Sequence, residues 1–228
     1  MMESITPIFT WGQDRIFAGG NRDVVLLVEW KGNLPSENSR PGSHKVVARD
    51  IELRVWLEPH VTFKRCYGCE MEAGEGNSLL LKLGKIKTGQ RKFIGLEFTA
   101  SSSVAGKYEA LSLQWKYKKP TVERVRELPV KVLELEYAHH TRILSDTCCF
   151  YVEKHLELLK TAEKVEEAEA LRSKGQHSEA HEMLNRHADK MLLLAVRSGD
   201  PLLLKEAEML YKQIGLEHQQ RSKAAGGI

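Results

Sequence analysis

The chain has 228 residues, of which 42% are hydrophobic and 29% are charged, a composition typical of folded globular proteins rather than disordered ones. Its 34 basic and 31 acidic residues leave a net charge of +3, which is too balanced to indicate nucleic-acid binding without a concentrated basic face. No apolar run approaches the roughly 20 residues that span a bilayer, and the N-terminus lacks the layout of a signal peptide. We therefore expect a cytoplasmic protein that binds no membrane.

The first apolar segment, residues 16–30, is expected to form a strand that opens a sandwich. It contains a glycine turn at Gly19, followed by Arg22 and an apolar run that ends in Glu and an aromatic residue. The same order returns over residues 86–98, with Gly89 and Arg91. We interpret the two copies as hairpin corners of similar geometry, in which glycine supplies a positive φ and arginine caps the turn, and hence as pseudo-symmetry within one sandwich.

Residues 33–44 form a polar stretch rich in Pro, Gly, Ser and Asn between two strand-like runs. A loop of twelve residues is uncommon inside a compact sandwich. We interpret it as a linker.

Three later segments alternate polar and apolar residues, as half-buried strands do: 50–58, 110–117 and 130–137. Shorter apolar runs bounded by glycines lie between them, so we predict an all-β domain over residues 1–138. The basic stretch Lys116–Lys119 is interleaved with Trp115 and Tyr117. The simplest interpretation is a strand with its aromatic residues on one face and solvated lysines on the other; binding of nucleic acid is the alternative.

After residue 138 the apolar spacing changes to three and four, which predicts helices. The first helix ends near Gly175, the second spans about 178–197, and the third begins at Pro201, with Gly199 as a stop signal and Asp200 as N-cap. The predicted fold is α+β by segregation: an N-terminal antiparallel β-sandwich, with strand 16–30 joined through linker 33–44, followed over residues 139–228 by a three-helix antiparallel bundle.

The sharpest chemical motif is Cys66-Tyr67-Gly68-Cys69. Two thiolates at this spacing can form half of a tetrahedral zinc site or a redox pair, and they can also be plain structural cysteines, which we favour. Cys148 and Cys149 could complete a zinc site, but adjacent side chains diverge.

A second, weaker metal candidate is the pair His177 and His181, which lie four residues apart on one helical face. The residues around the pair do not match a zinc-protease pattern, and a solvated helix face is the simpler interpretation. The sequence contains no nucleophile elbow, phosphate-binding loop or dinucleotide fingerprint. We therefore predict no enzyme, no catalytic residue and no cofactor.

The order of these elements resembles the regions that flank the A domain in bacterial proteins carrying a von Willebrand factor type A (VWA) domain. Residues 16–30 resemble the strand before that domain, 83–91 a conserved corner of the following sandwich, and 111–117 a later strand. The spacing of Ala168, Gly175 and Ala180 is similar to that of tetratricopeptide-like hairpins. The Asp-x-Ser-x-Ser stretch that binds the metal of an A domain does not occur here.

The resemblance implies that the A domain itself is absent and that its place is taken by linker 33–44. It also implies a non-enzymatic interaction or scaffolding module with protein partners. The alternative is a zinc-binding or redox-sensitive protein that uses Cys66 and Cys69.

Overall fold

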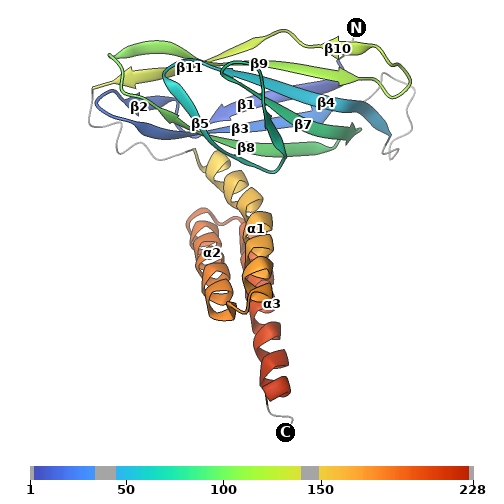
Figure 1. Cartoon of the computed structure of the whole chain (residues 1–228), viewed down its shortest axis with the longest axis vertical. Helices are drawn as coiled ribbons and strands as arrows, with labels where there is room; N and C mark the ends of the chain where they lie inside the picture. Colours follow the sequence, from blue (N-terminus) through green and yellow to red (C-terminus); the bar gives the residue numbers. More distant parts are fainter. Residues whose placement is uncertain (1–2, 34–44, 140–148, 226–228) are drawn as a thin grey trace. The chain divides into compact units, whose positions relative to one another are not determined.

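The computed structural model describes residues 3–33, 45–139 and 149–225, with only the backbone described from residue 216 onward. Strands fill the N-terminal part and three helices follow, so the fold is α+β with segregated β and helical parts, as predicted (Figure 1). Two compact units comprise residues 1–156 and 157–228, and their boundary falls inside the first helix. Beyond Asn33, the predicted linker 33–44 lies outside the described residues.

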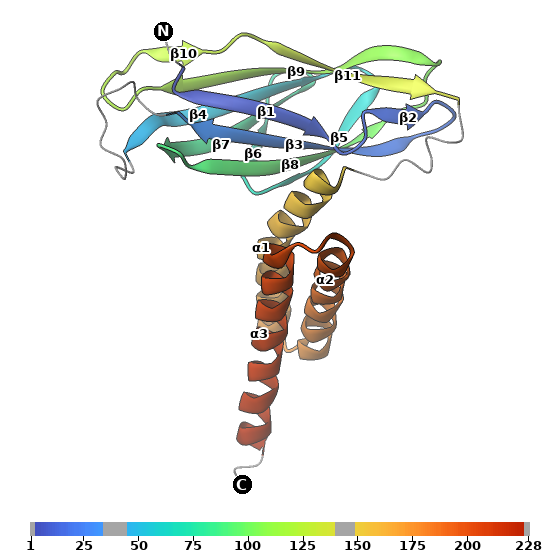
Figure 2. The ribbon, with the colours of Figure 1, turned by 180° about the vertical axis from the view of Figure 1, so that it is seen from behind.

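The first unit contains two packed sheets, which Figures 1 and 2 show from opposite sides. The four-stranded sheet is antiparallel and has the order β1 (Ile5–Trp11), β3 (Arg22–Gly32), β8 (Arg91–Ala100) and β5 (Val61–Tyr67). The seven-stranded sheet has the order β2 (Arg15–Phe17), β11 (Lys131–Ala138), β9 (Gly106–Lys118), β4 (Val46–Leu57), β7 (Ser78–Lys87) and β6 (Met71–Ala73), with β10 (Val125–Glu127) also paired to β9. Only β2 and β11 pair in parallel among the described strands.

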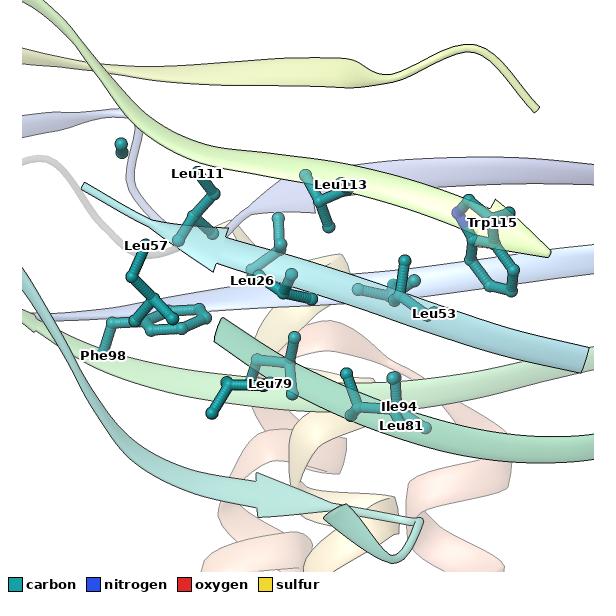
Figure 3. Close-up of a cluster of buried hydrophobic side chains, with 14 of the residues drawn as sticks. Leu26, Leu53, Leu57, Leu79, Leu81, Ile94, Phe98, Leu111, Leu113 and Trp115 are labelled. Atoms are coloured by element: carbon teal, nitrogen blue, oxygen red, sulfur yellow. The ribbon is translucent and has the colours of Figure 1, made fainter. Parts of the chain in front are cut away.

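The core lies between the two sheets, because alternate residues of each strand point inward. Figure 3 shows the inward side chains of both sheets meeting, among them Leu26 and Phe98 from one sheet and Leu53 and Leu113 from the other. The alternation predicted for residues 110–117 is confirmed, since Trp115 and Tyr117 are each 1% exposed. Two sheets that each bury one face against the other account for the period of two in the sequence.

The expectation of a single strand over residues 16–30 is wrong. The chain forms β2 in the seven-stranded sheet, turns at residues 18–21, and enters β3 in the four-stranded sheet. The second copy behaves in the same way, since β7 and β8 also belong to different sheets. At both corners the chain therefore passes from one sheet to the other, whereas a hairpin would join two neighbouring strands of one sheet. The strands that follow them, β3 and β8, pair with each other.

The detailed geometry of the two corners also differs from the expectation. Gly89 has a φ of 70°, whereas Gly19 has no positive φ. The arginines contact side chains: Arg22 lies 5.7 Å from the centre of the Phe17 ring, and Arg91 forms an ion pair with Glu29. The shared sequence pattern thus marks a shared sheet-to-sheet crossing, not a shared turn type.

The helices are α1 (Phe150–Ser173), α2 (His177–Ser198) and α3 (Pro201–Ala225). Their predicted limits are confirmed: Gly175 has a φ of 81°, Gly199 ends α2 in the left-handed conformation, and Asp200 Oδ1 accepts from Leu202 N at 2.9 Å. Helices α2 and α3 contact each other, and their buried residues are mostly small or aliphatic: Ala180, Leu184, Ala188, Met191, Ala195, Leu203, Ala207 and Leu210. Within the described part of the chain, no helix is both long and apolar enough to cross a membrane.

Candidate functional site

The described residues on either side of segment 34–44 lie at one corner of the sandwich. Gly32, the last residue of β3, donates from its N–H to Gln90 O (3.0 Å) and accepts from Gly89 N (2.8 Å). Lys45, just before β4, accepts from Thr88 N at 2.9 Å. The same three-residue turn between β7 and β8 therefore holds both ends. We call Gly32, Lys45 and the turn 88–90 the insertion corner.

Close packing at the insertion corner requires glycine at position 32. A Cβ atom on Gly32 would lie 2.2 Å from the Lys87 carbonyl oxygen and 3.0 Å from Val47 Cγ2. The first contact is with backbone, so it cannot be relieved by rotating a side chain. The end of β3 and the start of β4 are thus fixed beside each other, although they belong to different sheets.

A buried carboxylate lies next to this corner, on the outer face of the four-stranded sheet. The Glu29 side chain is only 4% exposed and forms an ion pair of 3.1 Å with Arg91, which directly follows the turn 88–90. The Tyr151 hydroxyl, from the first turn of α1, donates a hydrogen bond of 2.6 Å to the same carboxylate. Burial and the neighbouring Glu29 raise the pKa of Tyr151 to about 12, so this phenol stays protonated and remains a donor.

A ring contact reinforces the start of α1 against the same face. Phe93 of β8 and His155 stack with ring centroids 4.1 Å apart and an interplanar angle of 13°. Leu27 points outward from β3 yet is 1% exposed, and Val152 of α1 is fully buried. The insertion corner, the Glu29 carboxylate and the first two turns of α1 therefore form one connected cluster inside the first unit.

The edges of the four-stranded sheet are poorly suited to accept an added strand. Gly12 N donates to Val25 O of β3, and Ser4 O accepts from Asn33 N directly after β3. The backbone N–H and C=O groups of even-numbered residues of β1 therefore point to β3, and those of odd-numbered residues point outward. Pro7 is one of the outward residues and has no N–H to donate. The opposite edge, β5, contains a bulge between Phe63 and Arg65 and the exposed Lys64. Both features hinder edge-to-edge pairing.

The second unit contains a groove of about 510 Å³ between α1 and α2. Glu157, 3% exposed at its side chain, lies 2.9 Å from Lys190 Nζ and 3.3 Å from Lys160 Nζ. His187 is buried beside it, with Nε2 at 2.9 Å from Thr161 Oγ1. Burial lowers the pKa of His187. The charge of Glu157 raises this pKa, and the charges of Lys190, Lys164 and Lys160 lower it. The groove is polar and charged, and His187 carried no signal in the sequence because its burial comes from packing.

The predicted cysteine pair comes together in the structure. Cys66 at the end of β5 and Cys69 after it place their sulfur atoms 3.3 Å apart. Cys149 lies elsewhere, donating from its N–H to Gly12 O at 2.8 Å, and Cys148 is outside the described residues. Across residues 3–33, 45–139 and 149–225, no three His, Cys, Asp or Glu side chains gather as a metal site.

The histidine pair occupies the first turns of α2. His177 is exposed, while His181 Nδ1 lies 2.9 Å from Asn185 Nδ2. No third ligand joins them in the described part of the chain.

The basic strand cannot stack nucleic-acid bases on its aromatic residues, because Trp115 and Tyr117 are in the core. Its lysines face outward and meet carboxylates. Lys116 Nζ lies 2.7 Å from Glu127, and Lys118 Nζ lies 3.3 Å from both Asp50 and Glu123. This face therefore carries paired charges rather than a free basic patch.

Neither a protein-family model nor a curated protein matches the sequence. Among solved structures, the ArnB paralog VWA2 from Sulfolobus acidocaldarius is similar over 93% of this chain and 98% of its own, with a TM-score of 0.54 and 8% identity. The likeness is one of fold. A von Willebrand factor type A protein from Catenulispora acidiphila matches 68% of this chain with a TM-score of 0.49 and 15% identity, and this chain spans 37% of that protein. The N-terminal domain of the Streptococcus gordonii adhesin Sgo0707 matches 58% of this chain and 32% of its own, with a TM-score of 0.37 and 10% identity.

Proposed function

We propose that this chain is a non-enzymatic interaction or scaffolding module whose sandwich and helices flank and present a VWA-type domain, with segment 33–44 at the position where such a domain is inserted. The observation that carries the proposal is the insertion corner. Because Gly32 and Lys45 are bonded to one turn, the chain leaves and re-enters the sandwich at a single point. A domain whose termini lie close together fits such a point without separating the strands.

The fold likeness to VWA2 supports the same proposal, because it extends over nearly the whole of both chains. The VWA-type metal site is not part of this chain, since its sequence has no Asp-x-Ser-x-Ser stretch. In our proposal the chain therefore contributes the support and not the metal-binding surface.

The contacts beside the corner indicate how a support would work. Arg91 follows the turn that holds both chain ends, and it pairs with Glu29, which in turn bonds Tyr151 of α1. A buried carboxylate held by one hydrogen bond and one ion pair links the strands to α1. The inserted domain and the start of α1 would thus be anchored to the same two strands, β3 and β8.

An insertion experiment tests the proposal. A VWA domain with an intact Asp-x-Ser-x-Ser stretch is inserted between Glu37 and Asn38, and, as a control, between Pro59 and His60, where the turn is closed by Val61 N bonded to Glu58 O at 2.9 Å. Thermal unfolding of the sandwich and Mg²⁺ binding by the guest domain are measured for both proteins.

We expect the first insertion to shift the melting temperature of the sandwich by less than about 3 °C, or about 1 kcal/mol, and to leave Mg²⁺ binding intact. We expect the control insertion to destabilise the sandwich by several times that amount. Equal destabilisation at the two positions would rule out the insertion corner as a domain-bearing site.

A further inference from the structure

The two sulfur atoms of Cys66 and Cys69 form a feature that the proposed scaffolding function does not use. Cys66 is the sixth residue of β5 and pairs in register with Leu96 of β8, so its side chain packs against the sandwich core. Gly68, with a φ of 89°, then reverses the chain. That reversal brings Cys69 Sγ to 3.3 Å from Cys66 Sγ.

A disulfide bond is compatible with this geometry. Its S–S length is about 2.05 Å, so the sulfur atoms need to approach by only about 1.2 Å. The two residues lie where the chain passes from β5, an edge strand of the four-stranded sheet, to β6, an edge strand of the seven-stranded sheet. A turn between two edge strands can shift by this distance without displacing a paired strand.

A zinc site is less well supported by the same residues. Tetrahedral zinc takes four protein ligands in structural sites. In the described part of the chain no third His, Cys, Asp or Glu side chain joins the two sulfur atoms. Cys149 is bonded to Gly12 through its backbone and does not belong to this cluster.

We propose that Cys66 and Cys69 are a dithiol site that exchanges with low-molecular-weight disulfides and closes reversibly to an intramolecular disulfide. Both side chains are half-buried, while Gly68 and Glu70 beside them are exposed, so a small disulfide such as oxidised glutathione can reach the pair from solvent.

The two thiols interact, because either sulfur can donate a hydrogen bond to the other. The hydrogen bond with Cys66, burial, and the negative charges of Cys66 and Glu70 raise the pKa of the Cys69 thiol well above its ordinary value. Either thiol can lose the first proton; when Cys66 loses it, its thiolate attacks one sulfur of the disulfide RSSR. A Cys66–SR bond forms, the RS–SR bond breaks, and RS⁻ leaves and takes up a proton.

The second step uses Cys69. Once Cys66 is a mixed disulfide it carries no negative charge, so two of the causes that raise the Cys69 pKa disappear. Cys69 then loses its proton to solvent, and its thiolate attacks Cys66 Sγ. The Cys66–Cys69 bond forms, the Cys66–SR bond breaks, and a second RS⁻ leaves. In total, the protein dithiol and RSSR give the protein disulfide and two RSH.

Peptide mapping of the full chain after incubation with oxidised glutathione at pH 8 tests the proposal. Trypsin cleavage after Arg65 and Lys82 releases both cysteines in one peptide, apart from Cys148 and Cys149. We expect this peptide to lose two hydrogens and both of its alkylatable thiols, and to recover them with reduced glutathione. A peptide that keeps two free thiols, or a purified protein holding one equivalent of zinc that blocks both, would overturn the proposal.

Two single variants test closure between the two thiols. Cys69→Ser is expected to accumulate a stable mixed disulfide at Cys66, because no second thiol can displace glutathione. Cys66→Ser is expected to stop likewise at a mixed disulfide on Cys69, because the other thiol of the pair is absent. A peptide that loses two hydrogens in either variant would contradict closure between Cys66 and Cys69. If a variant fails to fold, the wild-type peptide map still decides whether the disulfide forms.

Discussion

The Tyr151 hydroxyl donates a hydrogen bond of 2.6 Å to the Glu29 carboxylate, although the two residues are 122 positions apart in the sequence. This bond joins the first turn of α1 to the central strand β3 of the four-stranded sheet. Arg91 binds the same carboxylate from β8, so three elements meet at one buried charge. Within the first unit, the cluster fixes the first turn of α1 on the strands that also carry the insertion corner.

Removal of the Tyr151 hydroxyl is expected to destabilise the sandwich. Tyr151→Phe leaves a buried carboxylate with one donor fewer, which costs about 1–3 kcal/mol of unfolding free energy. Urea unfolding followed by tryptophan fluorescence measures the change. The matched control is Tyr137→Phe, because the Tyr137 hydroxyl is buried and forms no hydrogen bond to any residue that the structure describes, so its loss should cost nothing. Equal losses in the two variants would show that the Glu29 contact contributes little.

Ionisation of Tyr151 is expected to weaken the first unit at high pH. The folded protein raises the pKa of this tyrosine from 10.0 to about 12, so the folded state retains the proton where the unfolded state loses it. The contribution of this pKa shift to the free energy of unfolding is complete below pH 10 and is lost as the pH rises towards 12. Unfolding at a series of alkaline pH values, with Tyr151→Phe as reference, measures it. A variant with the same alkaline dependence as the wild type would contradict the assignment.

Gly32 is expected to be intolerant of any side chain. Gly32→Ala places a Cβ atom 2.2 Å from the Lys87 carbonyl oxygen, so the backbone of the insertion corner must move, at a cost of about 1–3 kcal/mol. Gly20→Ala is the control, because a Cβ atom there meets nothing within 4 Å and the residue has no positive φ. We expect it to be neutral or to stabilise by up to about 1 kcal/mol. Denaturant unfolding measures the change in unfolding free energy for both variants. Similar changes in the two would argue against tight packing at the insertion corner.

The helical unit is expected to lose stability on mild acidification. Burial lowers the pKa of His187 from 6.5, so the folded state resists a proton that the unfolded state accepts. The groups that face this ring are Glu157, Lys160, Lys164 and Lys190. The contribution of neutral His187 to the free energy of unfolding is complete above pH 6.5 and declines as the pH falls below that value. Helical circular dichroism during urea unfolding at several pH values should show this decline in the wild type and in His177→Gln, but not in His187→Gln.

Asp200 is expected to stabilise the start of α3 through its side chain. Its Oδ1 accepts from Leu202 N at 2.9 Å and from Leu203 N at 3.2 Å, which satisfies two free helical donors. Asp200→Ala should lower the stability of the helical unit by about 1 kcal/mol, whereas Asp200→Ser should retain most of it. A thermal melt monitored by circular dichroism compares them. If the two substitutions have the same effect, the side chain is not acting as the cap.

The sequence by itself determined the class of fold and the limits of the helices. Alternating residues such as Leu53 and Val55 predicted strands, and Gly199 with Asp200 predicted a helix boundary, because side-chain period and capping depend only on neighbouring residues. The proximity of Cys66 and Cys69 was also accessible, since two residues and a glycine turn separate them.

Only the tertiary structure decided which sheet each strand joins and which distant groups share a site. The split of residues 16–30 between two sheets, the buried Glu29 beside Tyr151, and the burial of His187 all depend on contacts between segments far apart in the chain. The spacing of apolar residues along the chain indicates whether a residue faces a core. It does not indicate which strand pairs with which, because that choice is made by the joint packing of both sheets.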